Sequence, residues 1–291
     1  MEFLNGFYPA LGTPLDNDGN LVEESYAKQI ELMIDAKARG VLCMGSMGTE
    51  QALTTKTYRK TAEVASKAVN KRVPLLIGAM DNSVFRVKER IDALKGIDYD
   101  GLVLTTPFYQ MDSFKDLVNY FTEIADYSDK PVYLYDLPGV TKQKITFPLL
   151  KELAKHENIK GVKSGDIVLG RLVKLNLPNF NFFFSNLDIF DVSISYGIEK
   201  VLDGMFTCMP KTSKALTLAI EKGDKEEITK NVSTIIAFRD QFLKNGIWPG
   251  YTIAMNLLGL KGNYGVGYKK HEPLATEYEE VKEFMQKVGE I

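Results

Sequence analysis

Short, continuously apolar segments recur eight times along this 291-residue chain, and segments with helical spacing separate them. The apolar segments cover residues 6–11, 41–44, 74–79, 101–105, 131–135, 159–163, 180–185 and 201–203. Strands that are apolar along their whole length, rather than at every second position, are typical of parallel sheets covered by helices. Eight such strands alternating with helices predict an α/β fold, a closed (β/α)8 TIM barrel.

The remaining periodic segments indicate where the helices lie. We expect helices at 23–38, from about residue 54, and at 84–95, 113–127, 147–155, 167–175, 188–196, 209–221, 225–244, 249–258 and 277–288. No linker-like or low-complexity segment interrupts them. We therefore predict a barrel over residues 1–223 and a C-terminal extension of three helices over residues 224–291, packed on the barrel as one structural unit.

Composition excludes several classes of protein. The apolar and charged fractions, 45% and 25%, are those of an ordinary globular protein, and the net charge of −2 predicts no nucleic-acid or anionic membrane partner. No apolar run is long enough to cross a bilayer, and residues 1–6 lack the features of a signal peptide. The two cysteines, Cys43 and Cys208, are far apart, which indicates reduced, buried thiols in a cytoplasmic protein.

Metal binding is not predicted. The turn at residues 16–19 resembles the start of a calcium loop, but its glycine comes too early and no acidic residue closes the loop. His156, expected as a helix cap, and His271, in a late loop, have no partner at ligand spacing. The glycines at 262, 265 and 267 lie outside the barrel strands and predict a turn.

Residues 131–163 form a strand, a helix and a second strand, and this unit makes its two strands parallel neighbours. Thr146 is the expected cap of the helix. The strands end on Tyr135 and Lys163, so the phenol and the amine are expected close together at the edge where α/β sheets bind ligands. Lys163 alone could simply reach solvent, but its pairing with Tyr135 favours a chemical role. Tyr133 is expected to point the opposite way, towards the packing helices or into a different layer, and to serve the core.

Hydroxyl groups follow most of the other predicted strands. The residues concerned are Thr13, Ser46, Thr105, Thr106, Tyr109 and Ser185. An amine with phenols and hydroxyls, without a histidine or a carboxylate pair, suits Schiff-base chemistry. A neutral amine attacks a keto carbonyl, and the protonated imine then accepts electrons. Hydroxyls relay the protons, and the N–H groups of the 45–48 loop can hold a carboxylate. We expect no cofactor other than the covalent imine on Lys163.

Motifs in order along the chain identify a resemblance. They are Thr13-Pro14, Gly45-Ser46-x-Gly48, Thr106-Pro107-Phe108-Tyr109, Tyr135-x-x-Pro138, Gly161-Val162-Lys163, and Gly204 with Pro210. From Gly6 to about Pro273, the chain resembles the N-acetylneuraminate lyase and dihydrodipicolinate synthase superfamily of pyruvate-dependent class I aldolases. The resemblance implies a barrel with three C-terminal helices and a homotetramer built from two tight dimers.

The resemblance also implies roles for individual residues. Lys163 would form the imine with pyruvate, and Tyr135 would relay protons. Ser46 would contact the carboxylate and join the relay, and Tyr109 would reach into the site of the neighbouring subunit. The implied substrate-binding set is Gly45, Met47, Gly48, Val140, Gly165, Ser185, Asn186, Asp188 and Leu202.

The chain departs from the family pattern at the positions that meet the second substrate. Met47 stands in place of a second hydroxyl, and Thr49 in place of a glutamate. Val140 occupies the position where dihydrodipicolinate synthases carry an arginine for the carboxylate of the aldehyde. Gly165 replaces a threonine of the sugar-acid lyases. Residues 186–188 replace a glycine-containing acidic loop, which leaves Asp188 to bind a hydroxyl.

Three hypotheses about function follow. The first is a lyase that reversibly cleaves a 2-keto acid, such as a 2-keto-3-deoxy or sialic-acid-like sugar acid, to pyruvate and an aldehyde. The second is a synthase that condenses pyruvate with aspartate semialdehyde. The third, favoured by Met47 and Asn186, is a non-catalytic barrel that binds a small molecule. The identity of the aldehyde, the physiological direction and the choice between dimer and tetramer stay open.

Overall fold

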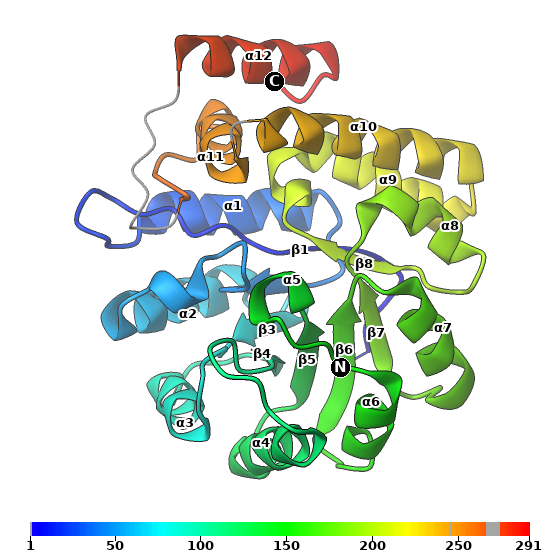
Figure 1. The fold of residues 1–291 in the computed structure, drawn as a ribbon. Coiled ribbons are helices and arrows are strands. Elements are labelled where there is room, and N and C mark those ends of the chain that lie inside the picture. Colours follow the sequence, from blue (N-terminus) through cyan, green and yellow to red (C-terminus); the bar gives the residue numbers. More distant parts are fainter. Residues whose placement is uncertain (1, 245, 266–273) are drawn as a thin grey trace.

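The fold is seen in a computed structural model that describes residues 2–244, 246–265 and 274–291. One sheet of eight parallel strands forms its centre, in the order β1-β8-β7-β6-β5-β4-β3-β2 (Figure 1). The strands are β1 (Gly6–Pro9), β2 (Val41–Cys43), β3 (Leu75–Gly78), β4 (Gly101–Thr105), β5 (Val132–Asp136), β6 (Ile159–Ser164), β7 (Asn181–Phe184) and β8 (Lys200–Asp203). A parallel bridge between Ala10 and Leu42 brings the two ends of the sheet together. The predicted eight-stranded barrel is confirmed.

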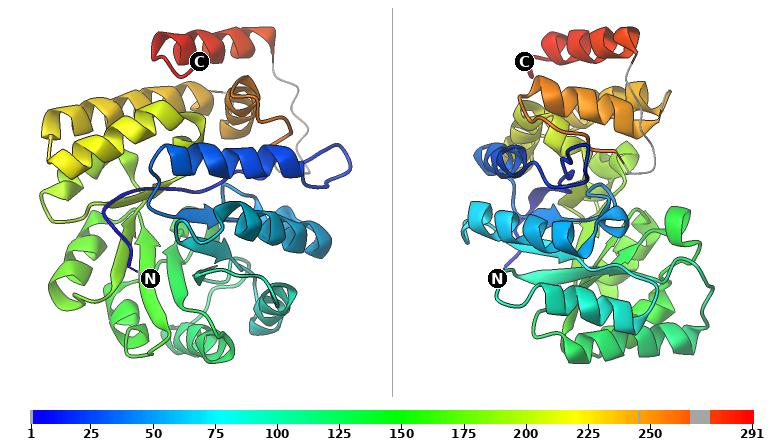
Figure 2. Two further views of the ribbon diagram at one scale, coloured as in Figure 1. Left: turned by 180° about the vertical axis from the view of Figure 1, so that it is seen from behind. Right: turned by 90° about the vertical axis from the view of Figure 1, so that its left-hand side faces the viewer.

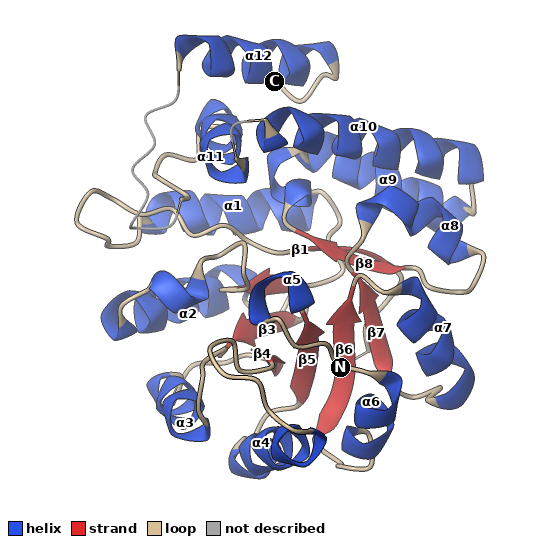
Figure 3. Ribbon diagram, in the orientation of Figure 1, coloured by secondary structure: helices blue, strands red, loops and turns tan. Residues whose placement is uncertain are grey.

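Helices follow the strands and cover the outside of the barrel (Figure 3). They are α1 (Glu23–Asp35), α2 (Thr55–Val69), α3 (Val84–Ala93), α4 (Phe114–Tyr127), α5 (Pro138–Thr141), α6 (Phe147–Leu153), α7 (Ile167–Asn176), α8 (Phe190–Ile194) and α9 (Pro210–Lys222). Short 3-10 turns, η1 (Glu50–Ala52), η2 (Leu187–Ile189) and η3 (Met205–Cys208), precede three of them. The helix predicted at 188–196 is therefore shorter, and η2 supplies its first residues.

Side-chain caps fix where several helices begin. Thr54, Ser83 and Thr146 each accept a hydrogen bond from the backbone N–H three residues later. Ser113 does the same, and the Asp116 carboxylate accepts a hydrogen bond from the Ser113 N–H, which completes a capping box. The predicted cap at Thr146 is confirmed.

The interior of the barrel is a separate buried cluster from the larger core between strands and helices. Its members are Phe3, Tyr8, Ala10, Leu42, Leu76, Met80, Val103, Tyr133, Tyr135, Phe183 and Leu202. Tyr133 therefore belongs to the core, as expected, but it shares the inward side with Tyr135. Side chains two residues apart in a strand point the same way, so the opposite orientation was wrong and the two phenols occupy successive layers. The Tyr133 ring lies 5.5 Å from that of Phe3, edge to face.

The C-terminal helices are α10 (Lys225–Leu243), α11 (Ile247–Leu257) and α12 (Ala275–Lys287). Helix α10 packs along α9 and also contacts η2 and α8, while α12 packs on α11 (Figure 2). Gly223, with a φ of +67°, makes the turn between α9 and α10. This turn coincides with the predicted boundary at residue 223, although the division into a barrel and an extension stays a prediction.

Smaller features of the sequence have simple structural explanations. The Asp16 carboxylate accepts the N–H groups of Asp18 and Asn20, as an ordinary turn does. Cys43 and Cys208 are free and buried. Gly267 and His271 lie outside the described residues. In the part of the chain that is described, no helix combines the length and apolarity needed to span a bilayer.

Candidate active site

Lys163 and Tyr135 are direct neighbours at the carboxyl ends of β6 and β5. The register pairs the two residues, and both side chains are buried, with exposures of 6% and 5%. The Lys163 Nζ lies over the face of the Tyr135 ring, 3.8 Å from its centroid. The expected meeting of amine and phenol is confirmed.

Ser46 adds a hydroxyl to this pair. Its Oγ lies 3.2 Å from the Tyr135 hydroxyl oxygen, within hydrogen-bonding distance. The amine, the phenol and the hydroxyl thus form a continuous group contributed by β6, β5 and the loop after β2. Protons can pass from the Tyr135 hydroxyl to Ser46 along this contact.

Hydrogen bonds also join the carboxyl ends of β5 and β6. Asp136 and Ser164, the next residues in each strand, are also register partners. The Ser164 Oγ donates to Asp136 Oδ2 at 2.7 Å, and the Ile145 N–H donates to Asp136 Oδ1 at 2.9 Å. Burial raises the pKa of Asp136, and these two donors oppose that shift. These hydrogen bonds help to hold Tyr135 and Lys163 side by side.

The loop that carries Ser46 is tightly folded. Non-glycine residues in the left-handed region bracket it, Met44 with a φ of 54° and Thr49 with a φ of 51°. Gly48 is required because a Cβ there would lie 2.8 Å from the Met44 Cα. The Thr13 hydroxyl donates to the Gly48 carbonyl at 2.7 Å and ties the loop to the end of the first strand. Such folding fixes the position of Ser46.

Met47, from the same loop, contributes an apolar side chain to the carboxyl end of the barrel. It packs on the interior cluster together with Leu137. A Cβ on Gly204, just after β8, would lie 2.5 Å from the Met47 Cγ, so the side chain fits only because residue 204 is glycine. Leu202 lies in the same interior cluster. The carboxyl end of the barrel is therefore partly apolar.

Gly165, Ser185 and Asn186 meet at the ends of β6 and β7. A Cβ on Gly165 would lie 3.5 Å from the Ser185 carbonyl oxygen and 3.6 Å from the Asn186 Cβ, which are ordinary contact distances. The site therefore has room at residue 165. The Asn186 side chain caps η2 by accepting the Asp188 N–H at 3.1 Å. These polar groups form one side of the rim, by which we mean the carboxyl-terminal edge of the barrel.

Asp188 is bound by a residue that the sequence analysis did not single out. Arg239 of α10 donates to both of its carboxylate oxygens, at 2.8 and 2.9 Å, and also bonds Asp240. The Arg239 guanidinium lowers the pKa of Asp188. The carboxylate of Asp188 thus already has a bidentate partner, and its predicted role in binding a substrate hydroxyl stays untested.

Asp203 is a second residue that the sequence analysis did not select. It ends β8, is partly buried, and accepts the Met205 N–H at 2.9 Å. Burial raises the pKa of its carboxyl, and the Met205 N–H and the positive charge of Lys163 act against the shift. A carboxyl group therefore lies within electrostatic reach of the Lys163 amine.

Comparison with known proteins identifies the family. A model of the dihydrodipicolinate synthetase family matches residues 3–289. The chain belongs to this family. It is 32% identical over 227 residues to the 4-hydroxy-tetrahydrodipicolinate synthase of Methanospirillum hungatei JF-1, covering 76% of this chain and 78% of that protein. The enzyme of the same name from Hydrogenobaculum sp. is 28% identical over 261 residues, covering 88% and 89%.

Solved structures share the fold of this family member over nearly its whole length. YagE of Escherichia coli K12, a prophage protein of the dihydrodipicolinic acid synthase family crystallised with pyruvate, has a TM-score of 0.89 at 24% identity, covering 99% of each chain. The N-acetylneuraminate lyase of Mycoplasma synoviae has a TM-score of 0.86 at 20% identity, also covering 99% of each chain. The resemblance stated from the sequence is confirmed, and with it the class of lysine Schiff-base lyases and aldolases.

Two predicted site residues of this family member lie apart from the buried group. Tyr109, in the loop between β4 and α4, is 84% exposed, and Val140, on α5, is 57% exposed. Within one chain Tyr109 is therefore not part of the enclosed site. Val140 is an uncharged, exposed side chain on the connection after β5, and its part in substrate binding stays a prediction.

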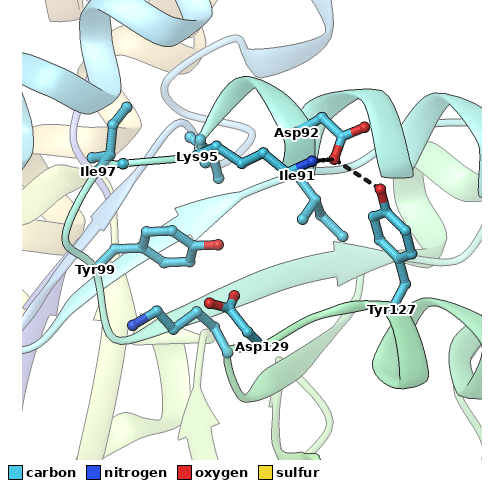
Figure 4. A pocket seen from close by; sticks show the side chains of 10 residues that line it. Ile91, Asp92, Lys95, Ile97, Tyr99, Tyr127 and Asp129 are labelled. Atoms are coloured by element: carbon cyan, nitrogen blue, oxygen red, sulfur yellow. Dashed lines mark hydrogen bonds and ion pairs between the residues drawn. The ribbon is translucent and has the colours of Figure 1, made fainter.

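Other chemistry-bearing groups of this family member lie elsewhere. The His156 ring accepts the Asn158 N–H at 3.1 Å and bonds Asp126 at 2.9 Å, while Ala154 is the C-cap of α6, so the expected role of His156 as a helix cap was wrong. Among the described residues, no three His, Cys, Asp or Glu side chains gather as a metal site. A cavity of about 390 Å³ lies beside Tyr99 and Asp129, which precede β4 and β5 (Figure 4). It is thus at the amino end of the barrel, opposite Lys163.

Proposed function

We propose that this protein is a lyase that reversibly cleaves a 2-keto acid to pyruvate and an aldehyde through an imine on Lys163. The observation that carries the proposal is the buried Lys163 amine over the Tyr135 ring, with the Tyr135 hydroxyl 3.2 Å from Ser46. The family and the pyruvate found in YagE support the choice of keto acid.

The reaction begins when the neutral Lys163 amine adds to the keto carbon and a proton reaches the carbonyl oxygen. Loss of water from this carbinolamine gives the protonated imine. In the cleavage direction the substrate hydroxyl on C4 loses its proton, the C3–C4 bond breaks, and the aldehyde departs. The electron pair of the broken C3–C4 bond is delocalised onto the imine nitrogen, which gives an enamine. Protonation at carbon and hydrolysis then release pyruvate and restore the amine.

Tyr135 and Ser46 serve the proton transfers of this sequence. The Tyr135 hydroxyl lies 3.2 Å from the Ser46 Oγ, and the Tyr135 ring carries the Lys163 amine on its face, so we assign the phenol the proton transfers of the bound keto acid, with Ser46 as its relay partner. The N–H groups of the loop from Gly45 to Gly48 hold the carboxylate of the keto acid. No separate cofactor is needed in this scheme, because the imine itself accepts the electrons of the breaking bond.

A hydroxylated aldehyde is the second substrate that the rim supports best. Ser185 and Asn186 supply polar groups beside the free space at Gly165, whereas Val140 supplies no charge for a second carboxylate. We therefore favour the cleavage of a 2-keto-3-deoxy sugar acid over the condensation of pyruvate with aspartate semialdehyde. The names of the relatives favour that condensation as the second candidate. Steady-state kinetics with both aldehydes separates the two.

Reduction with borohydride in the presence of pyruvate tests the proposal directly. The expected result is a stable reduced pyruvyl adduct on the peptide that contains Lys163, detected by mass spectrometry. A non-catalytic barrel that only binds a small molecule would give no adduct. That outcome would overturn the lyase proposal.

The surface supports assembly into a homotetramer, a dimer of two dimers. One group of exposed apolar side chains, Tyr109, Met111 and Phe114, lies around the β4–α4 connection. A second group, Val168, Val192 and Tyr196, lies on α7 and near α8. Two separate patches of this kind fit two kinds of subunit contact. In the first contact Tyr109 would enter the partner's site. We place the protein in the cytoplasm because Cys43 and Cys208 are free thiols.

A further inference from the structure

Glu50 is a fully buried acidic residue that begins η1, just after the loop that carries Ser46. Neither of its oxygens has a hydrogen-bond partner among the described residues. Its closest opposite charge is Arg90 of α3, whose Nε lies 3.2 Å from Oε1. A carboxylate buried in this way is destabilising unless an opposite charge or hydrogen-bond donors compensate for its lost solvation.

The groups around Glu50 come from four elements. The Arg90 guanidinium lies 4.9 Å from the centroid of the Tyr58 ring on α2, and its Nε is 3.7 Å from Asp81 Oδ2, after β3. Asp81 also bonds Arg86 of α3 at 2.6 Å, and the Tyr120 hydroxyl of α4 donates to the Asp81 carbonyl. Glu50, Asp81 and Arg90 thus form a buried cluster, and the exposed guanidinium of Arg86 pairs with Asp81 at its edge.

Glu50 is connected to Ser46 through a short segment of restrained backbone. The Thr49 N–H donates to the Ser46 carbonyl at 3.1 Å, and Thr49 itself is left-handed. Thr13 holds the same loop at Gly48. A shift of Glu50 within the cluster must therefore move either this turn or the residues before it. Ser46 has little freedom to absorb such a shift and still reach Tyr135.

We propose that Glu50 and Arg90 form a positioning pair that holds Ser46 within hydrogen-bonding distance of Tyr135, so that the charge on Glu50 tunes the rate of imine formation. This inference rests on the proposed function, because Ser46 and Tyr135 act in that reaction. Glu50 does not touch the reacting atoms and acts only through the loop.

The electrostatics of the cluster support this assignment. Burial raises the pKa of Glu50 to about 8, with Arg90 opposing the shift and Asp81 adding to it. The side chain therefore changes its charge in a range where enzymes are assayed. Arg86, Tyr58 and Tyr120 are the other titratable groups that face the cluster.

The test compares Glu50→Gln with Glu63→Gln, which removes the charge of a partly exposed glutamate paired with Arg59 on α2. The rate of borohydride-trapped imine formation with pyruvate is measured from pH 6 to 9. Glu50→Gln is expected to leave this rate near the wild-type value at pH 6, where Glu50 is protonated, to lower it by about tenfold to a hundredfold above pH 8, and to remove an inflection near pH 8. Glu63→Gln is expected to match the wild type.

Two further variants keep the test decisive. In a Ser46→Ala background, Glu50→Gln should have little additional effect, because both changes act on the same hydroxyl. The apolar pair Glu50→Leu with Arg90→Met retains the buried volume without charge, and it should be slow although folded. Wild-type rates and an unchanged pH profile in folded Glu50→Gln would overturn the inference alone. A wild type that traps no pyruvate would overturn the proposed function and this inference with it.

Discussion

The amine of Lys163 lies against the ring face of Tyr135, and the two residues are register partners in adjacent parallel strands. The pairing is a direct result of the β5–α6–β6 unit, which aligns the carboxyl ends of both strands. Because the ring covers the amine on one side, a keto acid has to approach from the open carboxyl end of the barrel, where Ser46 and Met47 lie.

Lys163→Ala should abolish imine formation, and we expect cleavage to fall by about three orders of magnitude or more, because the nucleophilic amine is removed. Borohydride trapping with pyruvate and a coupled assay for released pyruvate measure the two effects. Lys160→Ala, an exposed lysine in the same strand, is the matched control and should behave as the wild type. Trapping that persists in Lys163→Ala would place the imine elsewhere.

Tyr135→Phe keeps the ring beneath the amine and removes only the hydroxyl that reaches Ser46. We expect kcat to fall by about 10²-fold, within the usual range for a lost proton-transfer group, with a smaller change in KM. Tyr133→Phe removes a phenol hydroxyl one layer deeper and should leave kcat unchanged. Equal losses in both variants would show that packing, and not proton transfer, explains the effect.

Val140→Arg should bring a guanidinium to the open rim and improve the use of an aldehyde that carries a carboxylate. We expect kcat/KM for aspartate semialdehyde to rise about tenfold, since one added ionic contact is worth roughly 1–2 kcal/mol. Val140→Gln, which adds length without charge, is the control. A similar gain in both variants would assign the effect to size.

Tyr109 should act across a subunit boundary. Tyr109→Phe and Lys163→Ala are each expected to be poorly active, and a mixture after subunit exchange should recover about a quarter of wild-type activity. Random pairing makes half of the dimers mixed, and each mixed dimer has one intact site. The coupled assay, together with light scattering for the assembly state, measures both. If the subunits exchange but activity does not recover, Tyr109 does not act in the partner's site.

Glu50 should make stability decrease as the pH rises. Its pKa is raised by burial to about 8, above the value of about 4.3 in an unfolded chain, so the folded state retains a proton that the unfolded state loses. The stabilising contribution is complete below pH 4 and disappears as the pH rises through 8. The slope is at most about 1.4 kcal/mol per pH unit. Urea unfolding from pH 5 to 9 should show a weaker decline for Glu50→Gln, and parallel curves would contradict the shift.

The barrel and its central pair could be predicted because both depend on local patterns. Each strand is apolar along its length, so residues such as Leu42, Val103 and Val162 mark their strands without any knowledge of contacts. The closeness of Tyr135 and Lys163 follows from a single crossover connection. The orientation of Tyr133 was also predictable in principle, and the error lay in applying the alternation of strand side chains.

The contacts that the sequence did not predict join elements far apart in the chain. Arg239 meets Asp188 across 51 residues, and nothing in the spacing of α10 marks that arginine among the other charged residues of the helix. Likewise, nothing in the sequence marks Arg90 of α3 as the partner of Glu50 in η1. Asp203 was counted only as the end of its strand, although its position beside the lysine charge could have drawn attention to it.

The close fit of Met47 over Gly204 couples two positions that are 157 residues apart in the chain. Any effort to reshape the site must therefore change them together. A threonine at 47 would restore a hydroxyl but vacate the volume above the glycine, while any larger residue at 204 would displace the methionine toward the entering substrate. Evolution of new specificity in this barrel is consequently easier in paired steps than in single ones.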